Sequence, residues 1–252
     1  MYANYVDADV LINLHTNAST NAAASGTRAY VARDRPYDLE LANSILCGMK
    51  ELIHAQEPYR NFNVASQAEE SARYGENNKA HMPAVVLEVG FHTNLDDAAA
   101  LKDPVFREAA MKGVEKGLRL KAEGKVCEPF KIDNIPDVAG PHNTDIPAEI
   151  NYAGYPQFSV EQKTESVSCP SNWNCSPYSK VHADSESPLT FNFRCSATSS
   201  TPTATFRWRT ILMDADGVIT NVIQHSSTCT STALSSGALP LSNEKPTVYI
   251  TE

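Results

Sequence analysis

The hydrophobic pattern changes its period near the middle of this 252-residue chain. In residues 1–126, short apolar runs are separated by stretches in which apolar residues recur every three to four positions, as in helices that cover a sheet. In residues 127–252, apolar and polar residues alternate with the two-residue period of half-buried strands. Composition changes with it, from 21 Ala and 9 Ser plus Thr to 9 Ala and 31 Ser plus Thr. The pattern therefore predicts two domains of different class.

Residues 1–125 are predicted to form an α/β domain with a mainly parallel sheet flanked by helices. Ala8–His15 and Ala84–Phe91 are apolar enough to be buried strands, and Gly26–Val31 is predicted to be a third. Asp103 before Pro104 is typical of an N-cap and a first helical residue. The two expected helices carry the apolar stripes Ala42, Ile45, Leu46, Met49, Leu52 and Ile53, and Phe106, Ala109, Ala110, Val114 and Leu118.

The second half is predicted to be all-β. Residues 126–164 contain several prolines and little periodicity, which favours a linker. Beyond them, Leu189–Cys195 and Phe206–Arg209 alternate apolar and polar residues. We therefore predict a C-terminal antiparallel, immunoglobulin-like β-sandwich over residues 165–252.

Charge and hydropathy exclude two classes of partner. The formal net charge is −9 and both halves are acidic, which opposes binding to nucleic-acid phosphates. No apolar run reaches the 18 residues of a transmembrane helix, so no transmembrane segment is expected. Residues 1–5 also lack the basic and apolar regions of a signal peptide.

Five of the six cysteines lie in the Ser/Thr-rich half, which is typical of exported proteins with disulfides. Cys169 and Cys175 are close enough to close a short loop, and Cys195 and Cys229 could join two strands. Cys47 is expected either to be a buried small hydrophobe or to pair with Cys127. The cysteines thus predict an extracellular or periplasmic location.

Four aromatic residues of the second half have two interpretations. They could form a surface on which a sugar stacks, or they could belong to the core of the sandwich. The residues are Trp173, Tyr178, Phe206 and Trp208. Envelope proteins or glycans are accordingly possible partners of the C-terminal domain.

His15 and Glu88 are the candidate chemical groups of the first half. His15 lies where an apolar strand gives way to polar residues, at the edge where open α/β sheets bind ligands. Glu88 interrupts a buried strand, and a carboxylate there must be neutral, be paired or face a site. The structural alternative is that Glu88 pairs with a nearby Arg or Lys and that His15 is merely hydrogen-bonded.

Two motifs carry a resemblance to a known family. Ala8–Ser19, followed by Gly26–Val31, and the later Met82–Asn94 resemble the zinc-dependent N-acetylmuramoyl-L-alanine amidases of the amidase-3 family, in the order that the family has. The resemblance covers about residues 1–122. It implies that His15 is a zinc ligand, that Glu88 is the catalytic acid/base and that peptidoglycan is the substrate.

The resemblance also implies the reaction. In that family, zinc-activated water cleaves the amide bond between N-acetylmuramic acid and L-alanine. A carboxylate such as Glu88 would take the proton of that water and pass it to the departing amine.

The chain departs from the family pattern at its start. The family has an earlier zinc histidine and a zinc glutamate, and neither motif occurs before His15. One ligand is too few for a zinc site. We therefore expect the N-terminal strand, helix and signal peptide to be missing, and the chain alone to be inactive. The alternative is a non-catalytic envelope- or peptidoglycan-binding protein that retains the fold.

Overall fold

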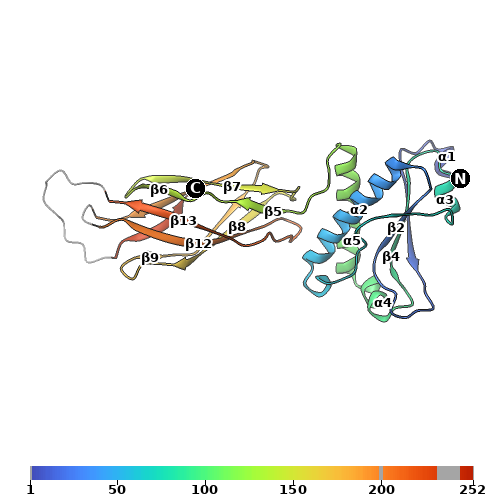
Figure 1. The fold of residues 1–252 in the computed structure, drawn as a ribbon, viewed down its shortest axis with the longest axis horizontal. Coiled ribbons are helices and arrows are strands. Elements are labelled where there is room, and N and C mark those ends of the chain that lie inside the picture. The colour runs from blue at the N-terminus through green and yellow to red at the C-terminus, as the bar shows by residue number, and fades with distance from the viewer. Residues whose placement is uncertain (1, 199–200, 232–244, 252) are drawn as a thin grey trace. The chain divides into compact units, whose positions relative to one another are not determined.

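A computed structural model describes residues 2–198, 201–231 and 245–251. The chain divides into two compact units, Met1–Pro129 and Phe130–Glu252 (Figure 1). Residues 199–200, 232–244 and 252 of the predicted sandwich lie outside the described residues, as does Met1. Within the described part, no helix is both long enough and apolar enough to cross a membrane.

The first unit is built on a four-stranded sheet with the strand order β1-β4-β2-β3. Its strands are β1 (Leu11–Asn17), β2 (Arg28–Val31), β3 (Glu69–Glu70) and β4 (Ala84–Phe91). Its helices are α1 (Tyr2–Tyr5), α2 (Pro36–Ala55), the 3-10 turn η1 (Glu57–Tyr59), α3 (Gly75–Asn78), α4 (Leu95–Lys102) and α5 (Pro104–Ala122). All residues of β4 are buried, as its apolar sequence predicts for a central strand.

The sheet is mixed: two of its three strand pairings are parallel, and the third is an antiparallel pairing that the sequence did not predict. β1 pairs with β4 in parallel and β2 with β3 in parallel, but β2 runs antiparallel to β4. The connection from β1 to β2 is a short loop over residues 18–27 without a helix. A parallel connection needs a crossover of a dozen or more residues, so β2 starts at the edge where β1 ends and runs back.

Helices α2 and α5 pack together on one face of the sheet (Figure 1). All six residues of the predicted α2 stripe are buried. The two helices approach closely because α5 places glycine against α2. A Cβ on Gly113 would lie 2.4 Å from the Met49 Cα. The buried face of α5 therefore continues through Gly113 and Gly117 to Leu120, whereas the predicted Val114 and Leu118 are only half-buried.

One buried ion pair lies between these two helices. The Lys116 ammonium donates to Glu51 Oε2 at 2.5 Å, and the two side chains are 6% and 8% exposed. A buried charge is tolerated when an opposite charge neutralises it. Asp103 caps α5 as predicted, because its Oδ1 accepts a hydrogen bond from the Val105 backbone N–H.

The second unit consists of two five-stranded sheets, with the orders β10-β8-β12-β13-β6 and β5-β7-β11-β14-β9. The strands are β5 (Lys131–Asn134), β6 (Val138–Pro141), β7 (Asp145–Ala153), β8 (Val160–Ser168), β9 (Asn174–Cys175), β10 (Tyr178–His182), β11 (Leu189–Ser196), β12 (Ala204–Met213), β13 (Ile223–Thr230) and β14 (Thr247–Thr251). Most pairings are antiparallel as predicted, but β6–β13 and β9–β14 are parallel. The immunoglobulin-like classification stays a prediction.

The predicted linker over residues 126–164 is wrong, because β5, β6, β7 and the first half of β8 lie there. The prolines concealed these strands. Pro136 and Pro156 fall between strands, and Pro141 ends the edge strand β6, where proline is tolerated. Ile146, Ala148 and Ile150 do alternate with exposed residues in β7, and this period could have revealed the strand.

The two sheets of the second unit face each other across an aromatic core. The Phe193 ring of β11 stacks on Trp208 of β12, with 5.5 Å between the centroids. A disulfide from Cys195 to Cys229 joins the sheets as the sequence suggested. The Cys169–Cys175 loop closure is confirmed, and Cys47 pairs with Cys127 inside the first unit, which was the second of the two interpretations.

The aromatic residues considered as a sugar-stacking surface are mostly core. Trp173, Phe206 and Trp208 are at most 4% exposed, and Trp173 and Phe206 contact each other edge to face. Buried rings cannot stack on a ligand, so these three residues form no carbohydrate platform. Binding of envelope proteins or glycans by this unit therefore stays a prediction, and these three rings do not support it.

We expect the two disulfides of the second unit to differ in their contribution to stability. Replacing Cys195 and Cys229 with Ser should lower the free energy of unfolding by about 3–4 kcal/mol, because their loop is long. The matched control is the double replacement of Cys169 and Cys175, which close a loop of six residues, and should cost about 2 kcal/mol.

Urea unfolding followed by tryptophan emission measures both effects, since Trp173 and Trp208, the chain's two tryptophans, lie in this unit. Equal losses in the two double variants, or no loss in either, would contradict the expectation.

Candidate functional site

The fold places His15 directly beside Glu88. Their strands, β1 and β4, are neighbours as predicted, and His15 is the Cα partner of Glu88 in the parallel register. Paired residues project from the same face of a sheet, so both side chains lie on one face near the carboxyl ends of the two strands. The catalytic roles of these residues stay predictions.

A third charged residue extends this pair into a row across the sheet. Arg28 of β2 is the antiparallel partner of Glu88, so Glu88 lies between His15 and Arg28 on the same face. The Arg28 guanidinium reaches Glu69 Oε1 at 3.9 Å, on the strand beyond. The row thus contains a central carboxylate with a cationic side chain on the neighbouring strand.

Glu88 is buried, and only half of its carboxylate is satisfied. Its residue is 6% exposed. Oε1 accepts a hydrogen bond from the Tyr74 hydroxyl at 3.1 Å, whereas Oε2 is buried without a hydrogen-bond partner. An unsatisfied buried polar atom is costly and is uncommon in folded proteins. In the described residues Glu88 is hydrogen-bonded by the neutral hydroxyl of Tyr74 and forms no ion pair with an Arg or Lys, which differs from the structural alternative.

Two tyrosines form the wall beside Glu88. Burial raises the pKa of Tyr74, and the charge of Glu88 and its hydrogen bond raise it further. Tyr74 therefore keeps its proton at neutral pH and remains a donor to Glu88. The Tyr30 ring lies 5.0 Å from that of Tyr74, and burial raises the pKa of Tyr30 as well. The Asn17 side chain on β1 opposes this rise in the pKa of Tyr30.

His15 contacts a carboxylate that the sequence analysis did not identify. Its Nε2 lies 3.2 Å from Glu76 Oε1, and both side chains are partly exposed. Tyr74 and Glu76 both come from the segment around α3, which packs against β4. That segment is short and rich in Gly and Asn, and it has no hydrophobic period, so nothing in its spacing indicated that it would cover the site.

The donors around His15 do not complete a zinc site. A catalytic zinc needs three protein ligands. Over the described ranges, no group of three or more His, Cys, Asp and Glu side chains is arranged to hold a metal ion. His15 and Glu76 supply two donors at most, so the residues that the structure describes do not by themselves fit zinc.

Polar groups at the carboxyl ends of β1 and β4 tie the neighbouring loops together. His92 Nδ1 is hydrogen-bonded to the Thr16 hydroxyl at 3.0 Å, and Thr93 Oγ1 accepts from the Ser19 backbone N–H. Below them, the buried Asp97 carboxylate accepts from the backbone N–H groups of Gly26 and Phe91. These contacts fix the loop over residues 18–27 against the end of β4.

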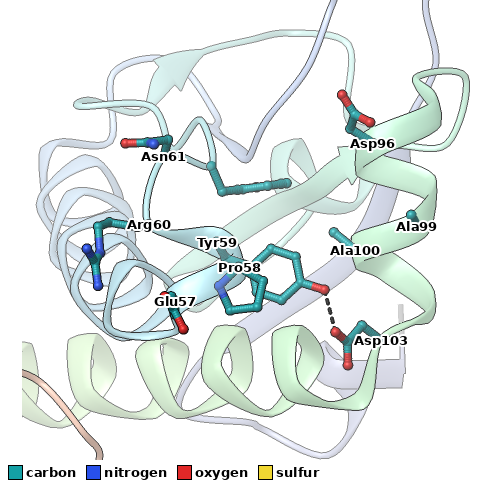
Figure 2. Close-up of a pocket in the computed structure, with 10 residues that line it drawn as sticks. Glu57, Pro58, Tyr59, Arg60, Asn61, Asp96, Ala99, Ala100 and Asp103 are labelled. Carbon is teal, nitrogen blue, oxygen red and sulfur yellow. Dashed lines mark hydrogen bonds between the residues drawn. The ribbon is translucent and has the colours of Figure 1, made fainter.

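A separate pocket of about 590 Å³ lies between residues 57–62 and α4 (Figure 2). Neither His15 nor Glu88 lines it. Figure 2 shows Tyr59 and Asp103 pointing toward one another, and the Tyr59 hydroxyl donates to Asp103 Oδ2 at 2.5 Å. Burial and this bond raise the pKa of Tyr59 to about 12. Because Asp103 also caps α5, this contact is explained by the packing of the fold.

Residues 1–119, a little under half of the chain, match the family described as N-acetylmuramoyl-L-alanine amidase. The amidase LytC of Bacillus subtilis is 28% identical over 112 residues, which are 44% of this chain and 21% of LytC. The chain therefore spans about a fifth of the length of that relative.

Two solved structures are similar to this chain. An N-acetylmuramoyl-L-alanine amidase of Clostridium difficile 630 is 21% identical with a TM-score of 0.43. The catalytic domain of CwlV from Bacillus (Paenibacillus) polymyxa var. colistinus is 25% identical with a TM-score of 0.40. Each similarity covers 49% of this chain and 63% of the other.

The unsatisfied carboxylate of Glu88 predicts an unusual effect on stability. Glu88→Gln keeps an acceptor for Tyr74 and removes a buried charge, so the free energy of unfolding should rise by about 1 kcal/mol at pH 7. The matched control is Glu51→Gln, which leaves the Lys116 charge buried without an opposite charge and should lose about 3–5 kcal/mol.

Urea unfolding followed by helix ellipticity at 222 nm measures both variants, because the long helices lie in the first unit. If Glu88→Gln destabilised the protein as much as Glu51→Gln, Glu88 would be an ordinary structural carboxylate, and its assignment to a functional site would be wrong.

Proposed function

We propose that the first unit carries the chemistry of a peptidoglycan amidase, which hydrolyses the amide bond between N-acetylmuramic acid and L-alanine. One observation carries the proposal: a buried glutamate with an unsatisfied oxygen stands beside a histidine, in a segment that matches the amidase family. A buried carboxylate with a free lone pair is suited to removing a proton from water.

The reaction needs one group that moves a proton twice. Water attacks the amide carbonyl, and Glu88 takes a proton from that water. The C–N bond then breaks, and Glu88 returns the proton to the departing nitrogen. The products are a lactyl carboxylate on the sugar and a free amino group on L-alanine, so atoms and charges balance.

Tyr74 is the positioning residue of this scheme. Its hydroxyl holds Oε1 of Glu88, which leaves Oε2 as the oxygen that accepts the proton. Oε2 is buried, and α3 packs on the strand that carries it. Residues 74–78 therefore have to move before a water and a substrate reach this oxygen.

The zinc site that the family resemblance implies disagrees with the ligands that the described residues supply. The resemblance to the family implies His15 as a zinc ligand, and we retain that assignment as a proposal. Because the described residues lack a three-ligand group, we derive no step through the metal. We also propose that residues 1–252 alone hydrolyse peptidoglycan slowly or not at all.

The contacts of the site also favour a second candidate function. His15 is engaged by Glu76, and Glu88 is engaged by Tyr74 and closed to solvent. These contacts close the site, which a protein that binds peptidoglycan without cleaving it could tolerate. The second candidate is therefore a non-catalytic envelope-binding protein with an amidase-like first unit.

Location and partners follow from either candidate. Peptidoglycan lies outside the cytoplasmic membrane, and three disulfides suit an oxidising compartment. We accordingly propose an extracellular or periplasmic protein whose second unit contacts envelope proteins or glycans.

Weak metal binding is the first testable consequence. After equilibration with equimolar zinc and desalting, we expect well under one zinc per chain by mass spectrometry, because two donors hold zinc poorly. His15→Ala should remove what is retained, whereas Glu88→Ala should retain the wild-type amount. One zinc retained per wild-type chain would mean that other residues complete the ligand set.

Purified sacculi distinguish the two functions. Co-sedimentation measures binding, and labelling of new L-alanine amino groups measures cleavage of the proposed bond. We expect the chain to sediment with sacculi and to release stem peptides slowly, and Glu88→Gln to bind equally and release none. The exposed Glu70→Gln is the matched control and should behave as wild type.

Each outcome of this experiment decides between the candidates. Release that depends on Glu88 supports the amidase. Binding without release, at any zinc concentration, supports the non-catalytic protein. If the chain neither binds sacculi nor releases peptides, both candidates are wrong.

A further inference from the structure

Two buried polar atoms on one face of the first sheet have no partner, and their hydrogen-bonding characters are opposite. Asn13 Nδ2 of β1 is a donor, and Glu88 Oε2 of β4 is an acceptor. Within the described part of the first unit, the one other buried side-chain atom without a partner is Asn77 Oδ1. It lies in α3, and the nitrogen of the same amide donates to the Tyr30 carbonyl oxygen. The sheet itself therefore contributes one unpaired donor and one unpaired acceptor.

The strand register places these two side chains on diagonal positions of neighbouring strands. Asn13 precedes His15 by two positions in β1, so both side chains project from the face that carries Glu88. His15 is the direct partner of Glu88, which makes Asn13 the diagonal neighbour of Glu88. Strands lie about 4.8 Å apart and rise about 3.3 Å per residue, so the two Cα atoms are about 8 Å apart. The side chains shorten this span, and one small polar group can therefore contact both unpaired atoms.

The neighbours of Asn13 on the sheet explain why its donor has no partner. The register partner of Asn13 is Val86, whose side chain cannot accept a hydrogen bond. The charge of Glu88 favours the amino end of the Asn13 amide over the carbonyl end on this side. A buried donor without a partner costs free energy, and a ligand that accepts its hydrogen bond removes this cost.

Two further donors on this face are already engaged. The Tyr74 hydroxyl donates to Glu88 Oε1 at 3.1 Å. The Arg28 guanidinium extends to Glu69 Oε1 at 3.9 Å, on the strand beyond. Asn13 Nδ2 differs from both, because none of the described residues accepts its hydrogens. It is therefore the donor of this face that is available to a ligand.

We propose that Asn13 and Glu88 together bind the amide group of the substrate. Asn13 Nδ2 donates to the carbonyl oxygen of that amide, and Glu88 Oε2 faces its nitrogen. A secondary amide presents an acceptor and a donor side by side, so one group satisfies both unpaired atoms. The ligand class is thus a secondary amide. This inference rests on the proposed function and adds to it a second residue that contacts the substrate.

The contact acts in the reaction as well as in binding. When water attacks the carbonyl carbon, negative charge develops on the carbonyl oxygen, and a donor already fixed there stabilises that charge without reorganisation. Asn13 transfers no proton, so the proton still moves through Glu88. Tyr74 and Glu76 cover this face, and the amide reaches Asn13 only after residues 74–78 have moved.

Binding by the full chain tests the contact without requiring turnover. The ligands are the uncharged N-acetylmuramoyl-L-alaninamide and its thioamide, in which sulfur, a weaker acceptor, replaces the carbonyl oxygen of the muramoyl amide. By calorimetry, wild type should bind the amide about tenfold more tightly than the thioamide. In NMR, the amide should also shift the side-chain NH2 resonances of Asn13 downfield, as a new hydrogen bond does.

Variants locate the preference in Asn13. Asn13→Leu keeps the approximate volume and removes the donor, so it should bind the amide about tenfold more weakly than wild type. It should also bind the amide and the thioamide equally, within about twofold. The matched control is Asn61→Leu, because Asn61 is exposed and lies in the segment 57–62, outside the sheet. Asn61→Leu should keep the wild-type preference for the amide.

Three results would overturn the contact. Equal binding of the two ligands by wild type is one, and it needs no variant to fold. A preference for the amide that Asn13→Leu retains is another, because a different donor or a bound water then makes the contact. In both cases the ligand still binds, so the proposed function stands. The third is that wild type binds neither ligand; co-sedimentation with sacculi then decides the proposed function separately.

Discussion

The parallel pairing of β1 with β4 is the constraint on which the candidate site depends. It brings His15 opposite Glu88 from positions more than 70 residues apart, and the antiparallel pairing of β2 then sets Arg28 on the other side. Because β4 is buried along its whole length, Glu88 cannot turn to solvent. The charge is fixed in the sheet, and the rest of the site is arranged around it.

Two buried glutamates in the first unit illustrate the difference between packing and chemistry. Glu51 is neutralised by Lys116 across a helix contact that glycine makes close. Glu88 receives one hydroxyl donor and has an oxygen without a partner. The first arrangement satisfies a charge, whereas the second leaves a lone pair available at a cost in stability. That contrast is the physical basis for assigning a function to Glu88 and only a structural role to Glu51.

The second unit combines a covalent link with a polar network in its core. The Cys195–Cys229 disulfide and the stacked rings of Phe193 and Trp208 hold the two sheets together. Hydrogen bonds among Thr164, Thr210 and His225 lie in the same core, and burial lowers the pKa of His225 to about 4. Such a core is stable only while its donors and acceptors match, so its stability depends on proton concentration where that of an apolar core would not.

The sequence by itself determined the local elements and the candidate pair. Helical stripes, the Asp103 cap, the buried strands and the position of His15 and Glu88 at their ends are properties of nearby residues, and periodicity reports such properties directly. The cysteine spacing likewise indicated the Cys169–Cys175 loop. The sequence did not determine strand direction. Whether β2 runs parallel or antiparallel to β4 depends on how a short loop crosses the sheet.

Only the tertiary structure decided which distant groups meet. Tyr74 and Glu76 come from a segment without a hydrophobic period, and they reach the site because α3 packs on β4. The strands over residues 126–164 were hidden by prolines, of which Pro147 lies inside β7 and the others lie outside strands or at the end of the edge strand β6. The buried hydrogen bonds among Thr164, Thr210 and His225 join three strands whose pairing no local pattern encodes. Long-range pairing brings these residues together, and their chemistry exists only once the chain has folded.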